Sequence, residues 1–164
     1  MAAMLDLAAA IRRLVHAVAG ALSWLPPPLA RFAVGWLFLW TGWGKLHNLP
    51  GIVDYFGQLG IPYPEYQAPF AAANEFVCGL LILIGLGTRL ACVPLIIVMI
   101  VAIATAQRAN VTSLYDLIGL SEFLYITLLI WIGVAGPGPL SLDRLIAPRL
   151  ARPATPTLHA HPAR

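Results

Sequence analysis

Residues 67–86 read QAPFAAANEFVCGLLILIGL and contain one charged side chain, that of Glu75. An α-helix rises about 1.5 Å per residue, so a stretch of this length extends about 30 Å, the thickness of the hydrocarbon core of a bilayer. The stretch therefore predicts a helix that crosses a membrane. It also places an ionisable group inside that membrane, where such a group is costly unless it is paired or protonated.

Three further stretches have the length and composition of membrane-spanning helices, at about residues 29–46, 90–109 and 117–136. Of all residues, 60% are hydrophobic and 10% are charged, whereas about 25% are charged in soluble domains. The sequence therefore predicts an all-α fold, a four-helix transmembrane bundle embedded in a lipid bilayer. The net charge of +3 comes from basic residues that flank the apolar stretches, which argues against a nucleic-acid partner.

Residues 1–28 differ from these stretches because their apolar side chains recur with a helical period. These side chains fall on one side of the helix, and Arg12 and Arg13 fall on the other. The pattern predicts an amphipathic helix over about residues 4–25 that lies in the membrane interface and is stopped by the three prolines at 26–28. The alternative is a cleaved signal peptide, in which a basic segment precedes an apolar one.

The rest of the chain divides into a membrane domain, residues 29–146, and a tail, residues 147–164, whose composition predicts disorder. Positively charged loops stay on the cytoplasmic side of a bacterial inner membrane, and four crossings leave both termini on one side. We therefore expect both termini to be cytoplasmic. The side so predicted holds Arg12, Arg13, Arg31, Arg89, Arg144, Arg149, Arg152 and Arg164, and the other side holds Lys45 and Arg108.

Four charged residues lie at a similar level near the predicted outer face. Glu75 and Glu122 share helix faces with small residues, which mark helix contacts in membranes. Lys45 closes the first span and Arg108 closes the third. We expect the four side chains to form a charge-balanced cluster that binds a small ligand or a proton. Alternatively, the cluster only fixes how the helices pack, as buried ion pairs can do.

Aromatic residues near this level suggest a wall for a ligand. Trp36 and Trp40 lie deep in the first span, and Tyr115 shares a helix face with Glu122. They are candidates for the wall of a quinone-sized cleft; for the two tryptophans, lipid contact or helix packing is the alternative.

The two cysteines supply no redox motif. Cys78 and Cys92 form no C-x-x-C pair, and no Cys/His spacing of a zinc site is present, so we predict no metal. Their positions along the spans suggest different depths, which argues against a disulfide. Their role stays unassigned, and the sequence assigns no catalytic residue and no evident cofactor.

An ordered series of short motifs resembles the DoxX family of small bacterial membrane proteins. The resemblance extends from Arg31 to Ile146. The segments that match are Gly42-Trp43-Gly44-Lys45, Leu59-Gly60-Ile61-Pro62, Asn74-Glu75-Phe76 followed by Gly79-Leu80-Leu81, Gly87-Thr88-Arg89, and Gly138-Pro139-Leu140-Ser141-Leu142-Asp143-Arg144.

The resemblance implies a four-helix membrane protein associated with redox chemistry. The family is named for a subunit of a thiosulfate:quinone oxidoreductase, and some members belong to membrane oxidoreductase complexes that respond to thiol stress. We therefore expect a membrane subunit of a redox, thiol or quinone-linked system, enzymatic only as part of a complex, with quinone as the candidate ligand. A soluble oxidoreductase and a second copy of the chain are the candidate partners. The alternative is a non-enzymatic membrane scaffold or a small transporter-like protein.

Overall fold

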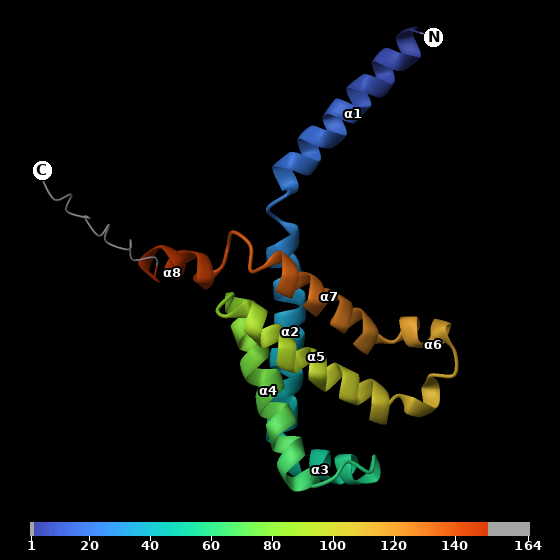
Figure 1. Ribbon diagram of the computed structural model, residues 1–164, viewed down its shortest axis with the longest axis vertical. Helices are drawn as coiled ribbons and strands as arrows, with labels where there is room; N and C mark the ends of the chain where they lie inside the picture. Colours follow the sequence, from blue (N-terminus) through green and yellow to red (C-terminus); the bar gives the residue numbers. More distant parts are fainter. Residues whose placement is uncertain (1, 151–164) are drawn as a thin grey trace, which may run out of the picture.

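A computed structural model describes residues 2–150 of the 164-residue chain. Within these residues every regular element is a helix, so the predicted all-α class is confirmed for this part of the chain. Figure 1 shows their arrangement. The helices are α1 (Ala2–Leu22), α2 (Pro26–His47), α3 (Leu49–Gln58), α4 (Pro64–Ile84), α5 (Thr88–Thr105), the 3₁₀ helix η1 (Arg108–Asn110), α6 (Leu114–Gly119), α7 (Ser121–Ala135) and α8 (Leu142–Leu150).

Helix α1 extends away from the other helices (Figure 1). Its apolar side chains are exposed, with Leu7 at 62% and Ile11 at 54%. The helix ends at Leu22, and the three prolines at 26–28 form the first turn of α2 rather than the stop of α1. Proline is tolerated there because the first N–H groups of a helix have no partner within it. The location of α1 in a membrane interface stays a prediction.

Helices α2 and α4 pack most closely of all the described helices, because glycines remove side chains between them. A Cβ atom on Gly35 would lie 2.7 Å from the backbone nitrogen of Leu83. A Cβ atom on Gly79 would overlap the backbone of Leu39, and Gly42 faces the α4 backbone in the same way. The glycines let the two backbones touch, which brings the side chains of both helices within bonding distance of each other.

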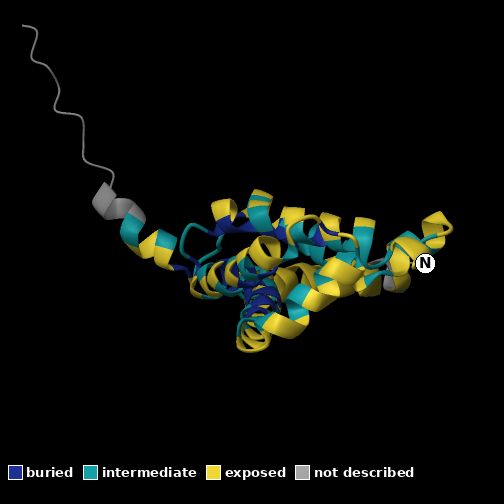
Figure 2. Cartoon of the chain, turned by 90° about the horizontal axis from the view of Figure 1, so that it is seen from below, coloured by how far each residue is buried: buried dark blue, intermediate teal, exposed yellow. Residues whose placement is uncertain are grey.

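Helix α5 packs mainly on α7, and this pair packs against α2 and α4. One core lies where the four helices meet, and in Figure 2 the buried residues gather there. Cys78 and Cys92 are both free thiols within this core. The buried core residues are Val34, Phe38, Cys78, Ile82, Ala91, Cys92, Leu95, Met99, Leu129 and Ile132.

Two of the described helices are long and apolar enough to cross a membrane, α4 with a mean hydropathy of 1.5 and α5 with 2.2. Helix α7 is apolar but has 15 residues. Helices α2 and α4 begin three residues before the predicted boundaries because prolines occupy their first turns. Helix α5 ends at Thr105, short of the predicted end at residue 109. The count of four crossings stays a prediction.

The predicted fourth span, residues 117–136, is not one continuous helix. The hydroxyl of Ser113 and the carboxylate of Asp116 form a capping box that begins the short helix α6. Leu120 then adopts an extended conformation, with φ −72° and ψ 139°, and α7 begins after it. A local cap and an extended residue thus divide this stretch into two helices, whereas its hydrophobicity alone predicts one.

Two short helices lie outside the predicted spans. Helix α3 lies in the connection between the first two spans. Helix α8 continues to Leu150, so residues 147–150 of the predicted disordered tail are helical. Residues 151–164 lie outside the described part of the chain.

Candidate functional site

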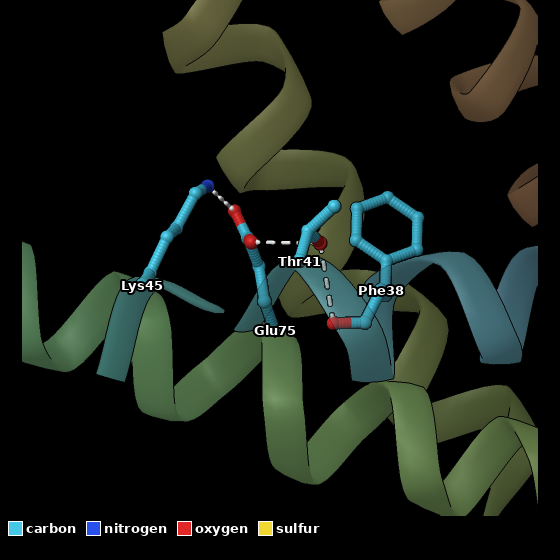
Figure 3. Close-up of polar contacts among 4 residues, drawn as sticks. All are labelled: Phe38, Thr41, Lys45 and Glu75. Atoms are coloured by element: carbon cyan, nitrogen blue, oxygen red, sulfur yellow. Dashed lines mark hydrogen bonds and ion pairs between the residues drawn. The ribbon is translucent and has the colours of Figure 1, made fainter. Parts of the chain in front are cut away.

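An ion pair joins the last turn of α2 to the middle of α4. The ammonium group of Lys45 lies 2.5 Å from Oε1 of Glu75, and the hydroxyl of Thr41 lies 3.2 Å from Oε2 (Figure 3). The Glu75 side chain is 1% exposed and that of Lys45 is 32% exposed. Both oxygens of the buried carboxylate therefore have a partner, which removes most of the penalty of burying it.

The ammonium group keeps unused donors. Lysine carries three N–H donors, and Glu75 is its hydrogen-bond acceptor among the described residues. Both Lys45 and Glu75 line a pocket. The pair therefore presents donors toward that pocket while its own charge is balanced.

A second polar group lies where α5 ends and α7 begins. The side-chain amide of Gln107 donates to Oε1 of Glu122 over 2.9 Å, and the hydroxyl of Ser121 lies 3.1 Å from Oε2. The amide of Asn110 in turn donates to the Gln107 oxygen over 2.8 Å. Two neutral donors, one from the loop after α5 and one from the first residue of α7, thus hold the Glu122 carboxylate.

The four residues of the predicted cluster do not form one group: Lys45 pairs with Glu75, Glu122 is held by Gln107 and Ser121, and Arg108 lies apart from all three. Helix α5 ends at Thr105, the chain turns into η1, and Arg108 is exposed there and does not line the pocket. Among the side chains of residues 6–146 the one salt bridge is that between Lys45 and Glu75. Gln107, which the sequence prediction did not consider, occupies the place beside Glu122.

One pocket contains both polar groups and has a volume of about 510 Å³. Its walls come from α2, α3, α4, α5, α7 and the segments that follow α3 and α5. In Figure 1, α2 and α4 run toward α3, whereas α5 and α7 run toward α6, so the two helix pairs diverge. Residues of both pairs line the pocket. The side chains that line it are mostly apolar, and they include Phe38, Tyr55, Phe56, Ile61, Met99 and Tyr125.

The predicted aromatic wall lies elsewhere. Trp36 and Trp40 stack on each other, with ring centroids 6.2 Å apart, and they line a separate, open groove together with Trp43 and Phe76. Tyr115 is 86% exposed and lines neither space. Phe38, two positions beyond Trp36, faces the core and the pocket instead, because two residues turn a helix by about 200°.

A third polar group lies at the opposite end of α2 and was not predicted. Arg31 is 4% exposed, and its guanidinium donates to the backbone oxygens of Pro137 and of Leu140, the latter over 2.6 Å. The sequence signal is an arginine at the start of an apolar stretch, which by itself indicates only the orientation of the helix. Its partners are backbone carbonyls of a distant segment, and no side-chain pattern reveals them.

Asp143 of α8 completes this end of the protein. Its carboxylate accepts hydrogen bonds from the backbone N–H of Gly87, over 2.8 Å, and of Thr88, over 3.4 Å. Its own N–H donates to the oxygen of Gly85 over 3.0 Å. An acidic side chain is favourable at the N-terminus of α5, where the first N–H groups lack partners within the helix.

The segments that carry the family resemblance thus contact one another in two sets. Gly42 and Lys45 meet the segment of Glu75 and Gly79 at one end of α2. At the other end the turn after α4 meets the first turn of α8 through Asp143. The matched segments are therefore in contact in the fold. A chance likeness between apolar sequences would not lead us to expect such contacts.

Comparisons with known proteins agree with this pattern. The model of the DoxX family matches residues 27–108. An uncharacterized membrane protein of Mycobacterium tuberculosis is 35% identical over 153 residues, which cover 84% of this chain and 88% of the relative. No solved structure is significantly similar.

Two further relatives have informative names. A Bacillus subtilis protein named "Putative oxidoreductase CatD" is 32% identical over 72% of this chain and 84% of its own length. The inner membrane protein YphA of Escherichia coli is 28% identical over 71% of this chain and 86% of its own length. On the family match and on relatives that align over most of their length, the chain belongs to the DoxX family.

Proposed function

We propose that this protein is the membrane subunit of a redox or thiol-handling system and that its pocket binds a small, mostly apolar molecule with a polar head, a quinone being the candidate. The observation that carries the proposal is a pocket of about 510 Å³ in which Lys45–Glu75 and Gln107–Glu122 are polar groups on mainly apolar walls. Ligand sites in proteins have volumes of about 300–1,000 Å³ and a few polar groups on apolar walls.

A lipid-soluble ligand fits the surroundings of this pocket. Apolar walls remove the hydrocarbon part of a ligand from water, and the Lys45 ammonium is available to its head group. The name of CatD adds support for a link to oxidoreductases. In this proposal a soluble oxidoreductase exchanges electrons with the bound molecule, and the present chain binds and orients that molecule.

The proposed topology has four crossings in a bacterial inner membrane, with both termini in the cytoplasm and α1 in the inner interface. The excess of arginine near the termini and the turn after α4 supports this orientation, as does the name of YphA. Single cysteines introduced at residues 4, 54 and 113, after the two native cysteines are replaced, would test it. An impermeant maleimide applied to intact spheroplasts should label residues 54 and 113 and not residue 4.

Ligand binding is tested on the full chain, purified in a mild detergent. Titration with decylubiquinone should give saturable binding, and gentle extraction should retain a lipid-soluble molecule or a redox partner. Arg108→Gln, outside the pocket, should bind as the unchanged protein does. A cofactor-free protein that binds no decylubiquinone and retains no partner would support the scaffold alternative, in which the polar groups only fix packing.

A further inference from the structure

Of the two polar groups of the pocket, one can donate hydrogen bonds to a ligand and the other can accept them. Lys45 is a pure donor, and Glu75 uses one of its three N–H groups. Glu122 is an acceptor as a carboxylate, which has about four lone-pair sites. Gln107 and Ser121 are its side-chain partners, so acceptor capacity remains. The pocket therefore has a donor at one place and an acceptor at another.

The charges of the lining restrict the ligand further. The lining contains one ammonium group, that of Lys45, and two carboxylates, those of Glu75 and Glu122, whereas Arg108 is exposed and outside the lining. The formal charge of the pocket is therefore negative. An anionic head group would meet repulsion in a site whose apolar walls weaken solvent screening.

We infer that this pocket selects a neutral molecule that carries a hydroxyl group, and that it prefers the reduced, hydroquinone form of its ligand to the oxidised form. The inference rests on the proposed function and gives the chemistry of that same site. Lys45 donates to one oxygen of the ligand, and Glu122 accepts a hydrogen bond from a hydroxyl group. A quinone carbonyl has no hydrogen to donate. Beside Glu122 its oxygen lone pairs are repelled by the carboxylate, which weakens binding of the oxidised form.

The expected difference in affinity between the quinol and a ligand without a hydroxyl group corresponds to one hydrogen bond. A hydrogen bond to a charged group corresponds to a difference of about ten- to one-hundred-fold in affinity. We therefore expect decylubiquinol to bind about ten- to one-hundred-fold more tightly than its dimethyl ether, which has the same ring and tail and no hydroxyl donor. Decylubiquinone should also bind more weakly than the quinol.

The experiment is anaerobic titration calorimetry of the full chain in detergent with decylubiquinol, its dimethyl ether, decylubiquinone and dodecanoate. Glu122→Met removes the acceptor, and Glu122→Gln keeps the shape with a weaker, neutral acceptor. We expect the ratio of quinol affinity to ether affinity to fall to about one in Glu122→Met. In Glu122→Gln the same ratio should decrease several-fold. Glu65→Gln, on the exposed first turn of α4 and outside the pocket, is the matched control and should keep the ratio.

The outcomes separate this inference from the proposed function. Equal binding of the quinol, the quinone and the ether, or an unchanged ratio in Glu122→Gln, overturns the preference and leaves ligand binding in place. Dodecanoate binding as tight as that of the quinol overturns the argument from charge. If none of the four molecules binds, both this inference and the proposed function fail.

Discussion

The ammonium group of Lys45 and the carboxylate of Glu75 lie 2.5 Å apart and join two helices whose backbones already touch at glycines. Lys45→Met would leave the Glu75 carboxylate buried with Thr41 as its remaining partner. Loss of one member of a buried pair reduces the free energy of unfolding by about 3–5 kcal/mol, and we expect the lower end because Lys45 is partly exposed.

A double replacement distinguishes pairing from simple loss of contact. Lys45→Met combined with Glu75→Met puts apolar groups in both places, so it should destabilise the protein less than Lys45→Met alone. Thermal unfolding in detergent measures Lys45→Met, Glu75→Met and the double variant, and Glu65→Met on the exposed turn of α4 is the control. Additive losses of the two single changes would contradict the coupling.

Gly79→Ala should destabilise the packing of α2 on α4. The added methyl group would overlap the backbone of Leu39, and backbone atoms cannot move aside as a flexible side chain does. Overpacking of this kind costs about 1–3 kcal/mol or more. Gly44→Ala is the matched change, because a Cβ there meets nothing within 4 Å. It should be neutral or stabilise α2 by up to about 1 kcal/mol, through helix propensity. Equal melting temperatures of the two variants would refute the close approach.

Asp143→Ala should loosen the start of α5. The change removes the acceptor for the N–H groups of Gly87 and Thr88, and loss of a helix cap costs about 0.5–2 kcal/mol. Hydrogen exchange should accelerate in residues 87–90 and in α8. Asp54→Ala, on the exposed side of α3, serves for comparison. Unchanged protection at residues 87–90 would show that the cap has no role in solution.

The loop before α6 should respond to acid. Hydrogen bonds from Thr112, then from Ser113, hold the pKa of Asp116 below its ordinary value. A folded-state pKa below the unfolded one means that the stabilisation is present above the unfolded value of about 3.9. It is lost as the pH falls through the still lower folded value. Amide resonances of Thr112 and Ser113 should therefore titrate below about pH 4, and those of Asp116→Asn should not. Titration near neutral pH would exclude this carboxylate as the cause.

The sequence predicted a cluster of four charged residues, and Lys45 and Glu75 are the two of them that pair in the structure. Their contact depends on quantities that a sequence contains. Both residues lie on helix faces with small residues, and the rise per residue sets their level along the helices. Once α2 and α4 are adjacent, a charge at the end of one and a charge inside the other have few other partners. Their contact therefore follows from helical geometry.

Arg108 shows the limit of the same reasoning. The prediction continued the helix past Thr105 because the residues there are compatible with a helix, but the chain turns into η1. Gln107 then reaches Glu122 as a neutral donor, and a search for charged residues does not find it. Helix ends are decided by the tertiary contacts of a few residues.

Arg31 illustrates a second limit. Its partners are backbone oxygens more than 100 positions away along the chain. Every residue except its neighbours offers such an oxygen, so the sequence does not distinguish the correct one. The arginine itself, inside an apolar helix, was the visible signal that a buried acceptor site exists.

Because residues of both helix pairs line the pocket, a ligand bound there would contact both pairs at once. Helix α2 packs mainly on α4, and α5 packs mainly on α7. A molecule bound between Lys45 and Glu122 would therefore add contacts that link the two pairs beyond the core they share. By thermodynamic linkage, a ligand present at a hundred times its dissociation constant would add about 2.7 kcal/mol to the stability of the folded protein. The abundance of that small molecule in the membrane would then tune the stability of the protein that binds it.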